Sequence, residues 1–116
     1  MITSDQLKDA QQRVEALYRY LDIEAKTMQL EEEQLRTQDP GFWDDAQRAE
    51  EQMKKVKGIE KWIEGYKQVK LLVDELALAF DFYKEEMVTE EEVDENYRRT
   101  LQAIEELELR NMLRQE

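Results

Sequence analysis

The sequence predicts an all-α protein, an elongated antiparallel three-helix bundle with coiled-coil-like pairing and a long central helix. Three observations indicate this class. Apolar residues recur at helical spacing through most of the 116 residues, and strong helix formers dominate the composition. The single proline, Pro40, stands in the one clear loop signal, Asp39-Pro40-Gly41. A single domain spanning residues 1–116 accounts for the length.

The first helix is expected from about Ser4 to Thr37. Either Thr3 or Ser4 is suited to be its N-cap, because a hydroxyl oxygen there accepts from a free backbone N–H of the first turn. Every seventh position is apolar, and further apolar residues widen the stripe. The repeat is Leu7, Val14, Leu21, Met28 and Leu35, widened by Leu17, Tyr18, Ala25 and Leu30. A repeat of this length predicts one continuous seam against a partner helix.

The second helix is expected to begin near Asp44 and to run to about Glu86. Asp44 and Gln47 resemble a capping box, and Asp45 is the alternative N-cap. Downstream, the apolar spacing alternates between three and four residues, as in a coiled-coil seam. The seam residues are Ile59, Trp62, Tyr66, Val69, Val73, Leu76, Phe80, Tyr83 and Met87. An unbroken helix of this span is about 60 Å long, so the molecule must be elongated.

The third helix is expected to start at Thr89, which forms a second capping-box candidate with Glu92. Negative charge at 90–92 suits the positive end of the helix dipole, and Arg110 and Arg114 suit the other end. The apolar face of this helix is formed by Val93, Tyr97, Leu101, Ile104 and Leu107. Short connections make the three helices antiparallel neighbours.

The composition argues against an enzyme. The chain has no cysteine and no histidine, which excludes disulfides, Cys/His zinc sites and Ser–His or Cys–His nucleophiles. Its glycines are isolated, so no phosphate-binding loop is present. The glutamate runs 31–33 and 90–92 lie within helical segments, where adjacent side chains diverge, and they are interpreted as solvated surface. No catalytic residue, metal or cofactor is expected.

Neither a membrane span nor a secretory signal is expected. No segment approaches the roughly 20 consecutive apolar residues of a transmembrane helix. The first residues lack the basic region followed by an apolar region that is typical of a signal peptide. The cytoplasm is therefore the expected compartment. The net charge of −12 opposes the wrapping of DNA over a large area, since such binding depends on neutralising phosphates.

One stretch of the expected second helix is locally basic. It contains Lys54, Lys55, Lys57, Lys61, Lys67 and Lys70. One interpretation is that Lys54, Lys57 and Lys61 face RNA phosphates. The other is an ordinary solvated face with Lys/Glu pairs.

Two further features carry alternative interpretations. Phe42 and Trp43 beside the turn are either an aromatic anchor for a partner protein or a fold-back contact that fixes the turn. Gly58 and Gly65 each cost about 0.8–1 kcal/mol relative to alanine inside a helix, which suggests a reason for their presence. They leave room for Trp62 or for a neighbouring helix, or they mark a point where the helix bends.

Three segments resemble the N-terminal helical domain of bacterial class I peptide chain release factors, of the release factor 2 type. They are Arg19-Tyr20-Leu21-Asp22, the turn Asp39-Pro40-Gly41-Phe42-Trp43-Asp44, and Glu106-Leu107-Glu108-Leu109-Arg110-Asn111-Met112-Leu113. They occur in the family's order and span the chain. The turn is similar to the Pro-x-x-Trp-acid turn of release factor 2, which favours this type over release factor 1.

The resemblance implies an accessory domain. In the family, the full protein recognises UAA or UGA in the ribosomal A site, and a Gly-Gly-Gln loop promotes hydrolysis of peptidyl-tRNA. Neither the decoding tripeptide nor Gly-Gly-Gln occurs in this sequence. The resemblance further implies a position near the stalk base of the large subunit, with ribosomal protein and ribosomal RNA as partners, and a link to the GTPase release factor 3.

A second function fits the same periodicity. A free-standing helical adaptor or coiled-coil scaffold with no link to the ribosome needs the same apolar seam. The three family-like segments favour the first function. A small carboxylate-based hydrolase has little support, because no loop-rich concave region can be inferred from the sequence.

Overall fold

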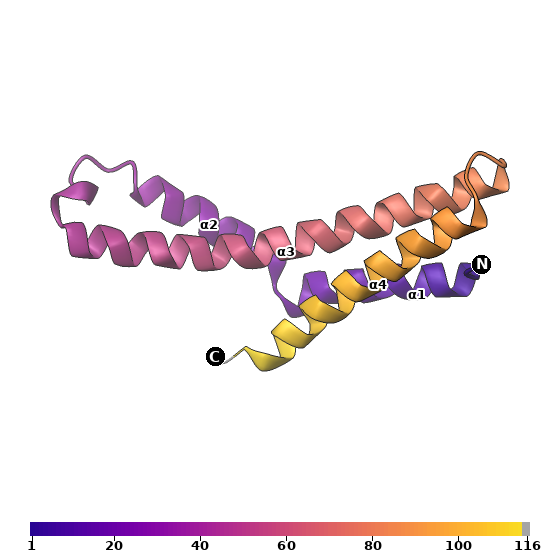
Figure 1. Ribbon diagram of the computed structural model, residues 1–116. Helices are drawn as coiled ribbons and strands as arrows, with labels where there is room; N and C mark the ends of the chain where they lie inside the picture. Colours follow the sequence, from indigo (N-terminus) through magenta and orange to yellow (C-terminus); the bar gives the residue numbers. More distant parts are fainter. Residues whose placement is uncertain (115–116) are drawn as a thin grey trace.

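The computed structural model of the protein describes residues 1–114, which form four α-helices and one short 3-10 helix (Figure 1). The elements are α1 (Ser4–Tyr20), α2 (Ile23–Arg36), the 3-10 helix η1 (Phe42–Asp44), α3 (Ala46–Lys84) and α4 (Glu90–Leu113). The predicted all-α class and elongated bundle are confirmed, with dimensions of 60 × 28 × 19 Å. The 39-residue α3 is the predicted long central helix. Within residues 1–114, no helix is both long enough and apolar enough to cross a membrane.

The expected single helix from Ser4 to Thr37 is wrong, because the chain breaks at Leu21 and Asp22. Asp22 has φ 54° and ψ 50°, a left-handed conformation that ends α1 and redirects α2. Aspartate is among the few non-glycine residues that adopt this conformation readily. Carbonyls at the break accept from basic side chains: Lys26 Nζ lies 2.5 Å from the Leu21 oxygen, and Arg114 Nη2 lies 3.2 Å from that of Tyr20.

Two of the helix N-termini are closed by reciprocal capping boxes. For α1, Thr3 rather than Ser4 is the N-cap, and its hydroxyl accepts from the Gln6 N–H at 3.1 Å while the Gln6 side chain accepts from the Thr3 N–H. For α4, the predicted pair is confirmed, since Thr89 accepts from the Glu92 N–H at 3.2 Å and Glu92 accepts in return. These bonds satisfy backbone donors that have no partner within the helix.

The second half of α3 is the centre of a three-helix bundle with α1 and α4 (Figure 1). The larger core cluster joins all three helices and consists of Ala10, Val14, Leu17, Leu21, Ile23, Val69, Val73, Ile104 and Leu107. A smaller cluster near the α3–α4 turn consists of Ile2, Leu76, Ala79, Phe80 and Val93. The predicted seam of the central helix is therefore buried as far as Phe80, except that Trp62 and Tyr66 are half-buried against the larger cluster. Its last two members, Tyr83 and Met87, are exposed and extend beyond the core.

Residues 23–61 form a separate hairpin, called the arm below, which extends beyond the bundle (Figure 1). It consists of α2, η1 and the first part of α3, whose inward side buries Ala49, Val56 and Ile59. The buried side of α3 in the arm lies about a third of a turn around the helix from the side buried in the bundle. The second half of the predicted first seam is wrong, because Ala25, Met28 and Leu35 are exposed on α2.

Candidate functional site

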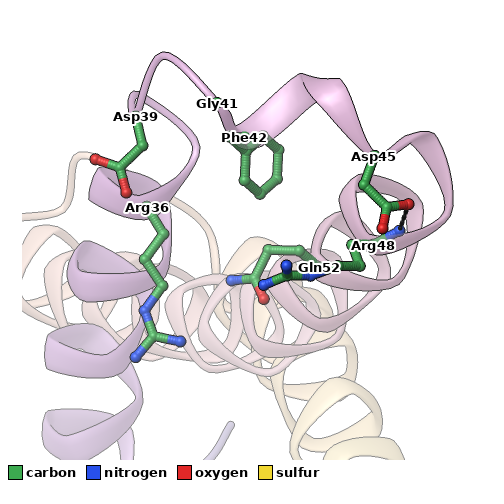
Figure 2. Close-up of a pocket in the computed structure, with 7 residues that line it drawn as sticks. All are labelled: Arg36, Asp39, Gly41, Phe42, Asp45, Arg48 and Gln52. Carbon is green, nitrogen blue, oxygen red and sulfur yellow. Dashed lines mark hydrogen bonds between the residues drawn. The ribbon is translucent and has the colours of Figure 1, made fainter.

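The tip of the arm carries the two aromatic residues that the sequence singled out. Their rings meet edge to face, with centroids 4.7 Å apart. Phe42 is half-buried and its ring points into the space between α2 and α3 (Figure 2), whereas Trp43 is 61 % exposed. The fold-back interpretation therefore describes Phe42, and Trp43 is left available to a partner.

A cleft of about 380 Å³ lies beneath Phe42, between the ends of α2 and α3 (Figure 2). Its lining residues are Arg36, Asp39, Gly41, Phe42, Asp45, Arg48 and Gln52. Asp45 is also the N-cap of α3, accepting from the Gln47 N–H at 3.1 Å and the Arg48 N–H at 3.2 Å. The predicted capping box of Asp44 with Gln47 is therefore wrong, because Asp44 belongs to η1 and the alternative cap is used.

A buried carboxylate joins the two helices of the arm one turn below the cleft. Glu33 of α2 is only 4 % exposed, and it accepts a hydrogen bond from the Gln52 side-chain amide of α3. Lys55 Nζ lies 3.3 Å and Arg36 Nη1 3.8 Å from its oxygens. The bond from Gln52 is the main cause that lowers the pKa of Glu33; Lys55 and Arg36 act in the same direction, and burial opposes them. The buried carboxylate therefore has polar partners from both helices of the arm, and removal of one partner would leave its charge less compensated.

The lysine face lies on the outer side of the arm. Lys54, Lys57 and Lys61 are exposed and, at spacings of three and four residues, share one side of α3, away from the buried Val56 and Ile59. Lys54 pairs with Glu50 of its own helix, with Nζ and Oε1 3.5 Å apart. Such an exposed pair contributes only about 0–1 kcal/mol and exchanges readily for another anion.

The other three lysines of the basic stretch have acidic partners within the protein. Lys55 contacts buried Glu33, Lys67 lies 3.8 Å from Glu64, and Lys70 lies 2.8 Å from Asp74. The Lys/Glu-pair interpretation therefore describes these three residues and also Lys54, which pairs with Glu50. The face formed by Lys54, Lys57 and Lys61 is the part of the stretch that remains a candidate for binding an anionic partner.

The two glycines of α3 have different surroundings. A Cβ built on Gly65 meets Leu107 Cδ1 at 3.3 Å and Arg110 Nη1 at 3.5 Å, so a close neighbouring helix explains this glycine. A Cβ on Gly58 meets no atom within 4 Å. Gly58 lies one turn from both Lys54 and Lys61, so the lysine face includes one exposed position that has no side chain.

Replacing Gly58 by alanine is expected to raise the free energy of unfolding by about 0.5–1 kcal/mol, because alanine loses less backbone entropy in a helix and meets open space here. Gly65→Ala is the matched control. It is expected to give no gain, because the Leu107 methyl must move to admit the new Cβ. Urea unfolding followed by circular dichroism measures both. Equal gains at the two positions would contradict the close contact at Gly65.

One interaction of the site region was missed from the sequence. The guanidiniums of Arg110, in α4, and of Arg114, the residue that follows α4, lie 5.0 and 5.5 Å from the centre of the Trp62 ring of α3. These contacts join the end of α4 to the point where the arm meets the bundle. The sequence placed Trp62 in a seam and the arginines near a helix C-terminus, but periodicity alone gives no signal that they pair across helices.

The acidic runs do not gather into a metal site. In the part of the chain that the structure describes, no group of three or more Asp or Glu side chains is arranged to hold a metal ion. Glu31 and Glu32 are exposed, whereas Glu33 is buried against α3. The interpretation of residues 31–33 as uniform solvated surface is therefore wrong for Glu33.

No protein-family model matches the chain, and no solved structure matches it. The function is therefore inferred from the residues and their arrangement.

Proposed function

We propose that this chain is the N-terminal helical domain of a bacterial peptide chain release factor of the release factor 2 type, acting in the cytoplasm as a ribosome-binding module. The domain binds the ribosome and positions the full factor on it, and it has no catalytic role of its own. Its partners are the protein and ribosomal RNA at the base of the large-subunit stalk, with a functional link to release factor 3. Decoding of UAA and UGA and hydrolysis of peptidyl-tRNA belong to other parts of the full factor.

The three family-like segments support this proposal because each falls at a distinct structural landmark. The segment 19–22 contains the left-handed break between α1 and α2, and 39–44 forms the tip of the arm. The segment 106–113 forms the last turns of α4, including the Arg110 contact with Trp62. Segments that determine where the chain turns and where helices meet are expected to be shared within a family.

The observation that carries the proposal is that the arm carries both an exposed aromatic residue and a basic face. Trp43 is exposed at its tip, and the lysine face follows along its outer side. An exposed tryptophan suits a protein pocket, and lysines suit RNA phosphates. Although the net charge is −12, the Debye length of about 8 Å at physiological salt lets a local basic face act separately from distant acidic residues.

The test is the binding of the fluorescently labelled 116-residue chain to purified bacterial ribosomes, followed by anisotropy across a range of salt concentrations. Replacing Lys54, Lys57 and Lys61 together by glutamine is expected to weaken binding about tenfold at low salt. The slope of log affinity against log salt should become shallower by about 2–3, as expected for the loss of three phosphate contacts.

A triple variant of equal charge is the control. Lys8, Arg19 and Arg99 are exposed and lie outside the arm, so replacing all three by glutamine changes the net charge equally. This control is expected to bind about as tightly as the parent chain, within roughly twofold. Equal loss in the two variants would indicate a general charge effect. Absence of ribosome binding by the parent chain at low salt would reject the proposal and leave the helical adaptor as the better account.

A further inference from the structure

The outer side of α2 carries two large apolar side chains that the fold does not cover. Met28 is 60 % exposed and Leu35 is 63 % exposed. They are seven residues apart, so they lie on the same side of the helix, two turns from each other. Glu33, which faces α3, lies on a different side of α2. Met28 and Leu35 therefore point outward from the arm, and they are called the α2 strip below.

The surroundings of the α2 strip are acidic. The carboxylates within about one turn of it on the same side of the helix are all exposed, and they are Glu24, Glu31 and Glu32. The two basic side chains of α2 are directed elsewhere. Lys26 Nζ lies 2.5 Å from the Leu21 oxygen at the helix break, and Arg36 lies 3.8 Å from Glu33 on the inner side of the arm.

The charge distribution decides between two kinds of occupant. If a second copy used the same strip, symmetric pairing would place the glutamates of one chain against those of the other. A basic helix would instead place its lysines or arginines against these carboxylates while its apolar side covered Met28 and Leu35. The overall charge of −12 also favours the approach of a basic partner.

We propose that the α2 strip is a docking surface for a basic amphipathic helix of another protein. The inference is independent of the ribosome link, because it depends only on the exposure of Met28 and Leu35 and on the carboxylates beside them. It also gives the arm two sides of opposite chemistry: α2 presents apolar side chains among glutamates, and α3 presents the lysine face to an anionic partner.

The probe for the test is a synthetic helical peptide of leucine and lysine, with leucine along one side, carrying a fluorescent label. Its anisotropy is measured as the full 116-residue chain is added. The double variant Met28→Gln, Leu35→Gln is expected to raise the dissociation constant about tenfold. A peptide with glutamate in place of every lysine is expected not to bind. Tight binding of this acidic peptide would overturn the charge argument.

The control variant is Leu71→Gln, Leu78→Gln. These leucines are also seven residues apart and are each 52 % exposed, and Asp74 and Glu75 lie between them as Glu31 and Glu32 lie in the α2 strip. They differ in that Asp74 is paired with Lys70 at 2.8 Å, so the carboxylate charge beside them is partly neutralised. The control is expected to leave the dissociation constant within about twofold of the parent value. Both double variants should melt within about 2 °C of the parent chain, because all four side chains are exposed. Equal weakening by the two variants, or no weakening by the first, would overturn the proposal.

The oligomeric state separates the basic partner from a second copy. Sedimentation equilibrium of the chain alone is expected to show a monomer. A dimer that dissociates in the Met28→Gln, Leu35→Gln variant would assign the α2 strip to self-association and overturn the assignment to a basic helix.

Discussion

Leu21→Ala is expected to lower the free energy of unfolding by about 3 kcal/mol. Leu21 is fully buried in the larger core cluster, where it packs with residues of α3 and α4 at the end of α1. Truncation removes apolar contact and leaves a cavity that the fixed ends of two helices cannot close. Urea unfolding of the whole chain measures the loss, which corresponds to a fall of about 10 °C in Tm.

Leu35→Ala is the control for this prediction. Leu35 belongs to the same seven-residue repeat as Leu21, but it is 63 % exposed, and its truncation is expected to change the free energy of unfolding by less than about 0.5 kcal/mol. A similar loss at both positions would mean that Leu35 is covered as Leu21 is, as in the single continuous helix that the sequence suggested.

Trp62→Ala is expected to destabilise the chain by about 2–4 kcal/mol, because it removes a large ring packed against the core and two guanidinium contacts together. Trp62 lies against the larger core cluster, and the guanidiniums of Arg110 and Arg114, at the end of α4, lie over its ring. Part of the loss is thus electrostatic, so Arg110→Gln alone is expected to lower the free energy of unfolding by about 0.5–1 kcal/mol. Thermal and urea unfolding measure both variants.

The other tryptophan provides the comparison. Trp43 is at the tip of the arm, and Trp43→Ala is expected to leave the free energy of unfolding within about 0.5 kcal/mol of the parent value. The same variant should weaken ribosome binding by about tenfold if the tip enters a protein pocket. A variant that is both stable and fully active in binding would remove Trp43 from the proposed contact surface.

The parts of the fold that follow local rules could be predicted from the sequence. The Thr89–Glu92 capping box and the face of α4 from Val93 to Leu107 were predicted correctly, because both depend on residues three or four positions apart. The seam of α3 was predicted correctly between Ile59 and Phe80 for the same reason. The end of this seam was placed too late. The apolar spacing of three and four residues continues in the sequence to Met87, although Met87 is exposed.

The break between α1 and α2 could not be predicted from turn signals, because no glycine or proline marks it. One signal is present in retrospect. Leu21 and Ile23 are both apolar and both buried, although residues two apart point to different sides of a helix. They reach the same core cluster only because Asp22 turns the chain between them. The long seven-residue repeat concealed this signal, since it continues in the sequence through the break.

The candidate site was predicted in part. The turn at 39–44 and the lysine face were recognised from composition, and the structure places both on the arm. The buried Glu33 and the stacking of Arg110 and Arg114 on Trp62 were not recognised, because they join residues that are far apart in the sequence. Such contacts depend on how one helix is rotated against another, and periodicity does not determine that rotation.

The continuity of α3 couples the position of the arm tip to the orientation of α3 in the bundle. The same unbroken helix runs from the tip of the arm into the bundle, while the other connection between them is the single turn at Asp22. About 20 residues of helix separate Asp45 from Gly65, a distance of about 30 Å. A tilt of about 10° at the junction therefore moves the tip by about 5 Å, roughly the width of one side chain. A movement of Trp43 at the tip is therefore expected to reach the bundle through α3, at the point where Trp62 contacts Arg110 of α4.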